Sequence, residues 1–275
     1  MLVRLATVML ASTVLAGAGQ APDLPPRDTF LREVREALTR SQEAWHRYSY
    51  RERRTELHLN PFGRMGTGGI QVFEVRPSTN PKLTYRRLIE RNGVQVSRQE
   101  LDRQDAEYAA RVRAIVTHDK GDAAEPNERR RGEELLARRR AQMIVEDVVA
   151  TLQFELARRE LRDGKPAIVV SFAARPDARP ATREGQLTKV FRGHIWVDEA
   201  SREVTDVRAV AMDDVTFGGF VAKVYEGMET VIERDEVQPG VWMPTRLSLR
   251  GDVRAIFRRA RIDHVVEWFD YRAVR

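Results

Sequence analysis

The sequence predicts a mainly β protein with added helices, in the α+β class. We expect one large antiparallel curled sheet, an unclosed β-barrel of about ten to eleven strands, with helices packed on its concave face. Residues 193–212 alternate apolar and polar side chains around a polar break at 198–202, as a β-hairpin does, and nearly all later segments repeat this form. Amphipathic helical patterns before and between the strands have apolar stripes that need burial. Because strand twist accumulates, so large a sheet curls.

The N-terminus differs in kind from the rest of the chain. Residues 1–18 combine Arg4, an apolar run too short to span a bilayer, and the small residues of Ala16-Gly-Ala18. This pattern predicts a cleaved signal peptide and a periplasmic, secreted protein. Residues 19–27 form a proline-rich joint, which disfavours the alternative of a buried N-terminal helix.

The composition narrows the class of protein further. The chain has no cysteine, so it offers no lipobox for a lipoprotein anchor and no disulfide framework. No later apolar run approaches 18 residues, so we expect no transmembrane anchor. The formal net charge of +6 is modest in 275 residues, and we expect no nucleic-acid partner.

We expect residues 28–275 to form a single domain that begins with a helix from Asp28, as its N-cap, to about Tyr48. Apolar residues recur along this helix at three- and four-residue steps, which gives one buried stripe. That stripe comprises Leu31, Val34, Leu38, Ser41 and Trp45. Strands are predicted at 48–59, 70–76 and 82–91, and Asn92-Gly93 suits a type I′ hairpin turn.

A helical insertion is predicted over residues 97–150. Ser97-Arg-Gln-Glu100 matches a capping box for a first helix, which ends near Lys120-Gly121, and a second follows from about 127 to 150. The second is rich in arginine, which indicates a solvated face, with contact to an anionic membrane surface as the alternative. These arginines are Arg129, Arg130, Arg131, Arg138, Arg139 and Arg140.

The second half of the chain reads as paired strands. Residues 153–161 and 167–174 predict a hairpin whose second strand is apolar on both faces, followed by a loop at 176–185 and a short helix within 186–192. After the hairpin of 193–212, further strands are predicted at 220–234, at 242–250 around Pro244, and at 255–271.

No catalytic, cofactor or metal motif is present. The five histidines are scattered without ligand spacing, and no Gly-x-Ser-x-Gly elbow, dinucleotide fingerprint or P-loop occurs. His118-Asp119 and Asp213-Asp214 could contribute to a site, but they are interpreted as loop or turn residues. We therefore predict no enzyme, no catalytic residues, no metal and no cofactor.

The order of elements over about residues 28–272 resembles the LolA/LolB lipoprotein-carrier superfamily, in particular its exported members of outer membrane lipoprotein-sorting type. A leading amphipathic helix, three strands, a helical insertion and meander strands with turns such as Val197-Asp-Glu-Ala-Ser-Arg-Glu-Val204 carry the resemblance. It implies an unclosed β-barrel with plugging helices and a periplasmic carrier that transports the acyl chains of a lipid or lipoprotein.

Lipid binding requires a dry groove between sheet and helices, because apolar burial alone can hold acyl chains. The candidate ligand-binding residues are Trp45, Val75, Ile195, Val197, Val207, Leu247, Leu249 and Ile262, with plain core packing as the alternative for each. Two other functions remain open. A structural or protein-interaction module of the envelope would show a filled interior and an apolar patch or free sheet edge. An exported hydrolase would need a polar cluster gathered from distant strands.

Overall fold

The computed structural model describes residues 23–59, 65–78, 83–121, 143, 146–217, 222–255 and 258–274. The helices are α1 (Arg27–Trp45), α2 (Arg98–Gly121) and α4 (Arg183–Thr188), and residues 146–151 are also helical. The strands are β1 (Tyr48–Leu59), β2 (Met65–Arg76), β3 (Tyr85–Arg91), β4 (Val94–Gln95), β5 (Leu152–Arg162), β6 (Lys165–Ala174), β7 (Phe191–Asp198), β8 (Val204–Ala211), β9 (Val215–Phe217), β10 (Ala222–Val224), β11 (Glu229–Gln238), β12 (Val241–Ala255) and β13 (Arg258–Ala273).

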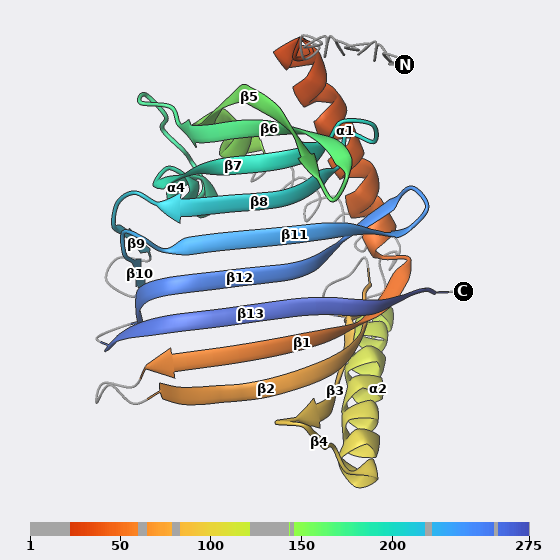
Figure 1. Cartoon of the computed structure of the whole chain (residues 1–275). Helices are drawn as coiled ribbons and strands as arrows, with labels where there is room; N and C mark the ends of the chain where they lie inside the picture. The colour runs from red at the N-terminus through yellow and green to blue at the C-terminus, as the bar shows by residue number, and fades with distance from the viewer. Residues whose placement is uncertain are drawn as a thin grey trace, which may run out of the picture.

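The strands form one antiparallel, unclosed sheet, as predicted (Figure 1). Its order is β4-β3-β2-β1-β13-β12-β11-β8-β7-β6-β5, and β9 and β10 attach at one side through β12. The described residues contain thirteen strands rather than ten or eleven. The first strand of the chain pairs with the last one, β1 with β13, so the two ends of the sequence meet in the middle of the sheet.

Strand register divides the sheet into two faces. Ile195 pairs with Val207, and the same row continues through Ile232, Leu247 and Val266. Paired residues share a face, and residues two apart along a strand do so as well. We call the face that bears this row the helix face, because α1 packs on it, and the opposite one the polar face.

The core lies between α1 and the helix face. Phe30 and Val34 of α1 pack with Ile168, Val170 and Val197. Each such apolar side chain contributes about 1.5–3 kcal/mol when buried. The central residues of β6 are buried on both sides, as its continuous apolar run predicted. The sheet therefore holds the helix. Val34 and Ser41 of the predicted stripe are buried, whereas the buried Phe30 and Ala37 were not part of the prediction.

Helix starts were predicted with mixed success. The residue before the first turn of α1 is Pro26, whose carbonyl accepts a hydrogen bond from the amide of Phe30, so the prediction of Asp28 as N-cap was wrong. Asp28 instead pairs with Arg27 inside that turn. The Ser97 cap of α2 is confirmed, since its hydroxyl accepts a hydrogen bond from the amide of Glu100 at 3.3 Å.

The remaining differences lie at element boundaries. The predicted strand at 220–234 is interrupted by a turn at Gly227, where φ is +81°, so β10 and β11 are separate strands. The short helix α4 begins earlier than predicted because Thr182 caps it. Pro244 lies inside β12 beside a shift in its register with β11, which accommodates the missing N–H.

Several predictions fall on residues outside the described ranges. These are the signal peptide of 1–18 and the arginines of the second predicted helix, Arg129 to Arg140. Within the described ranges, no helix has both the length and the apolar character needed to cross a bilayer.

Candidate functional site

The candidate ligand-binding residues of the sheet lie on one face, although they come from five strands. Val75 pairs with Tyr50 of β1, and Ile262 pairs with Gly251 of β12. Continuity of the register places all of them on the helix face together with Ile195, Val197, Val207, Leu247 and Leu249. Trp45, in the last turn of α1, packs against the Tyr50 ring of this face at a tilt of 56°, with centroids 5.0 Å apart.

Burial separates these residues into two groups. Val75 and Val197 are 0% and 1% exposed, and Ile195 and Val207 pack against the core under α1. Half-buried apolar residues follow on the same face. We call this group the apolar strip, and it comprises Ile232, Leu247, Leu249 and Ile262.

An aromatic cluster borders the apolar strip. The ring of Trp45 lies 6.4 Å from that of Trp268 and 6.3 Å from that of Tyr271, between centroids. Burial raises the pKa of Tyr50 to about 12, and it also raises the pKa of Tyr271. Both phenols therefore stay neutral at physiological pH, and Tyr271 donates a hydrogen bond to the carbonyl of Pro244.

A buried carboxylate lies beside this cluster. Glu52 is only 3% exposed and accepts hydrogen bonds from Arg54 at 2.5 Å, Arg86 at 2.9 Å and the Trp268 indole at 3.1 Å. Both guanidinium groups also lie over the ring of Phe73, at 5.6 and 5.4 Å from its centroid. The helix face therefore changes from apolar to cationic between the neighbouring strands β13 and β1, because Val266 pairs directly with Arg54.

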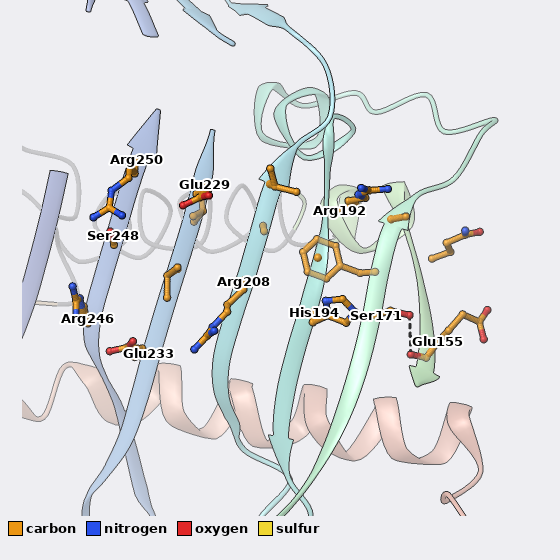
Figure 2. A pocket seen from close by; sticks show the side chains of 18 residues that line it. Glu155, Ser171, Arg192, His194, Arg208, Glu229, Glu233, Arg246, Ser248 and Arg250 are labelled. Carbon is orange, nitrogen blue, oxygen red and sulfur yellow. Dashed lines mark hydrogen bonds between the residues drawn. The ribbon is translucent and has the colours of Figure 1, made fainter. Parts of the chain in front are cut away.

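The polar face carries a groove of about 890 Å³ (Figure 2). Its labelled side chains are charged or polar, and they are Glu155, Ser171, Arg192, His194, Arg208, Glu229, Glu233, Arg246, Ser248 and Arg250. None of the candidate ligand-binding residues lines it. Apolar residues, among them Phe172, Val210 and Val231, line it as well, so this groove combines charged and apolar groups.

A second hollow of about 530 Å³ follows on the polar face at Arg162, Asp206 and Trp242. It too is lined by charged residues. Within the described residues, no group of three or more histidine, aspartate or glutamate side chains is placed to hold a metal ion. Asp214 binds Lys223 and the amide of Glu226, so it stabilises a turn, as interpreted from the sequence.

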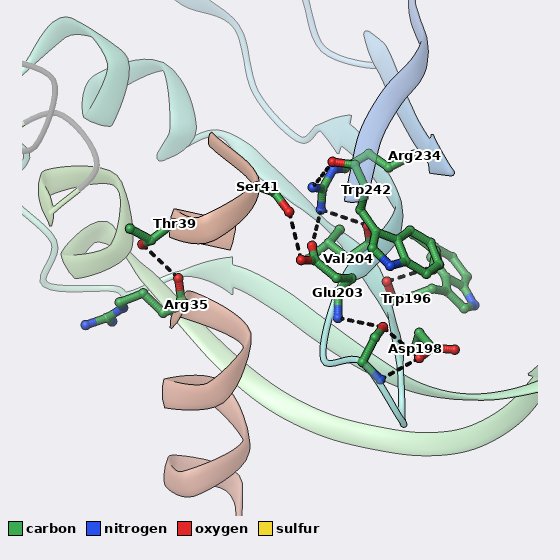
Figure 3. A network of polar contacts seen from close by, with 11 residues as sticks. Arg35, Thr39, Ser41, Trp196, Asp198, Glu203, Val204, Arg234 and Trp242 are labelled. Carbon is green, nitrogen blue, oxygen red and sulfur yellow. Dashed lines mark hydrogen bonds and ion pairs between the residues drawn. The ribbon is translucent and has the colours of Figure 1, made fainter. Parts of the chain in front are cut away.

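A buried polar network ties α1 to the sheet (Figure 3). The Ser41 hydroxyl donates to Glu203 at 2.7 Å, and Arg234 pairs with the same carboxylate at 3.1 Å. Arg234 also donates to the carbonyls of Val204 and Trp242. Burial lowers the pKa of Arg234, and Glu203 opposes that shift. These contacts fix the helix where it crosses β8 and β11.

Glu52, Arg54 and Arg86 were not predicted from the sequence as site residues. Glu52 and Arg54 stand in the run Arg51-Glu-Arg-Arg54, which resembles a solvated strand face, and Arg86 stands beside Arg87. The two-residue alternation of side chains along a strand could have found Glu52 and Arg54. They alternate with Arg51 and Arg53, so they share a face with Tyr50.

Comparisons with known proteins give similarity of structure only. Neither the protein-family models nor the curated proteins contain a match. Among solved structures, a LolA superfamily protein from Nitrosomonas europaea is 9% identical with a TM-score of 0.33, over 88% of this chain and 94% of that one. A Vibrio parahaemolyticus domain described as outer membrane lipoprotein-sorting is 10% identical with a TM-score of 0.35, over 90% and 93%.

The Pseudomonas aeruginosa MucA/MucB complex contains a chain that is 9% identical with a TM-score of 0.24, over 88% of this chain and 99% of that one. The resemblance to the LolA superfamily stated from the order of elements is thus also found by comparing structures.

Proposed function

We propose that this protein is a non-enzymatic periplasmic carrier that holds acyl chains of a lipid or lipoprotein on the helix face, beside α1. The single observation that carries the proposal is the apolar strip, whose side chains remain half-buried on the face that forms the core elsewhere. Such side chains are already partly desolvated and are positioned by the sheet.

The energetics favour an acyl ligand. Removing a chain from water contributes about 0.8 kcal/mol per methylene, so a few methylenes on the strip give useful affinity without polar contacts. The sheet is unclosed, so a chain can lie along this face without a narrow barrel mouth. Residues 1–18, interpreted as a signal peptide, support export to the periplasm.

The test compares two neighbouring residues of β12. Leu249 lies on the helix face and Ser248 on the polar face, so Leu249→Glu should abolish uptake of a fluorescent fatty-acid probe while Ser248→Glu leaves it unchanged. Equal loss in both variants, or uptake by neither the wild type nor the variants, contradicts the proposal. Circular dichroism of both variants checks that the fold is retained.

A protein-interaction role is the second candidate, and the outer edge of β5 is the place where a partner strand could be added. In the described part of the chain, β5 pairs with β6 alone. A register shift between Leu156 and Arg158 and the charges of Arg159 and Arg162 make this edge a poor template for another strand. A carrier function therefore fits the structure better.

A further inference from the structure

We propose that Arg54 and Arg86 bind the anionic head group, a carboxylate or phosphate, of an amphiphile whose tail lies on the apolar strip. This inference rests on the proposed function and specifies its ligand class. The arginine pair lies close to the apolar strip on the same face. Arg54 is the register neighbour of Val266, which is the neighbour of Leu247. At about 4.8 Å per strand, the cationic group begins about 10 Å from the strip.

Among the described residues, the charge of the Arg54 and Arg86 pair is not balanced. Two guanidinium groups share the single buried carboxylate of Glu52, so the cluster keeps a net charge of +1. The next carboxylate on the same face, Glu56, lies 3.7 Å from His264 instead. Neutralising Glu52 needs only one arginine, so a purely structural role leaves the second unexplained.

The arginines also keep free donors. Arg54 uses Nε and Arg86 uses one Nη for Glu52, and their side chains remain 34% and 36% exposed. The position of both guanidinium groups over Phe73 restricts their side chains before a ligand arrives. Guanidinium donors in a fixed plane suit the paired oxygens of a carboxylate or phosphate.

The experiment measures the affinities of three C12 probes, dodecanoate, dodecyl phosphate and dodecanol, by displacement of a fluorescent fatty acid. We expect at least one anionic probe to bind about tenfold or more tightly than dodecanol, as charge-assisted hydrogen bonds predict. The preferred anion distinguishes a fatty-acid source from a phospholipid one. In Arg54→Gln the advantage should fall to within about threefold.

Two variants separate recognition from structure. Arg53→Gln removes the adjacent arginine of the polar face, which pairs with Glu267, and should leave the anion preference unchanged. Glu52→Gln frees both guanidinium groups and should tighten anion binding several-fold, an effect that a structural role does not produce. It also provides a readout if Arg54→Gln fails to fold.

The outcomes distinguish the two proposals. If dodecanol binds as tightly as both anions in the wild type, or Glu52→Gln weakens anion binding, the head-group site is overturned while the carrier function stands. If none of the three probes binds, the carrier function itself fails, and the head-group site fails with it.

Discussion

At the scale of single residues, the face of the sheet to which a strand residue points decides the environment of its charge. Arg53 and Arg54 are neighbours, yet Arg53 lies beside Glu267 on the polar face and Arg54 reaches buried Glu52 on the helix face. Composition alone gives both residues the same solvated role. The face shared with Tyr50 separates them, but only once strand pairing shows which face α1 covers.

The Glu203 network gives a stability prediction. Glu203→Ala removes the partner of buried Arg234 and the acceptor of Ser41, so an unpaired charge remains in the interior. We expect the free energy of unfolding to fall by about 3 kcal/mol, measured by urea denaturation. The control Glu107→Ala breaks an exposed pair with Arg103 and should cause no measurable change. Equal stability of the Glu203 variant and wild type contradicts this account.

Glu199 gives a pH prediction. Hydrogen bonds from Arg159, at 2.6 Å to each oxygen, lower the pKa of this carboxyl in the folded state. Its stabilisation is therefore fully present above the ordinary glutamate pKa of about 4.3 and is lost as pH falls through the lower folded value. The stability gap between wild type and Glu199→Gln should close below about pH 4. A stability gap that stays constant from pH 7 to pH 3 would contradict a lowered pKa of Glu199 in the folded state.

At the scale of elements, strong local signals predicted well. The turn at Asn92-Gly93 has φ of +52° and +80°, as a type I′ turn requires, and the hairpin of β7 and β8 was predicted with its side-chain faces. The errors fall where a tertiary contact decides the boundary. Thr182, for example, is fixed by Asp147 from a distant helical segment, so the start of α4 was not visible locally.

Gly193 gives a prediction for the pairing of β7 and β8. A Cβ at this position would collide with the backbone carbonyl of Arg208 on the neighbouring strand, so the two strands cannot keep their present approach. Gly193→Ala should lower the free energy of unfolding by about 2 kcal/mol. Gly164→Ala, whose Cβ meets nothing within 4 Å, tests for the separate cost of its positive φ of +78°. A wild-type midpoint for Gly193→Ala contradicts the close approach.

At the scale of the whole molecule, the sheet has two faces with different chemistry. The helix face provides the core, the apolar strip and the arginine pair, whereas the polar face carries open, charged grooves. Because β1 pairs with β13, we also propose that residues 28–275 fold as one domain. The curled sheet was predictable from strand number. The sequence could not predict which part of the helix face is filled core and which is the half-buried strip, because both consist of Val, Ile and Leu at alternate positions.

The central claim is that the helix face carries an acyl ligand. Native mass spectrometry of the mature protein, purified from the envelope of its source and followed by organic extraction, tests it most directly. We expect a co-purifying lipid at about one per chain that is lost in Leu249→Glu and kept in Ser248→Glu. A protein without lipid that also takes up no fatty-acid probe would contradict the claim and shift attention to the edge of β5.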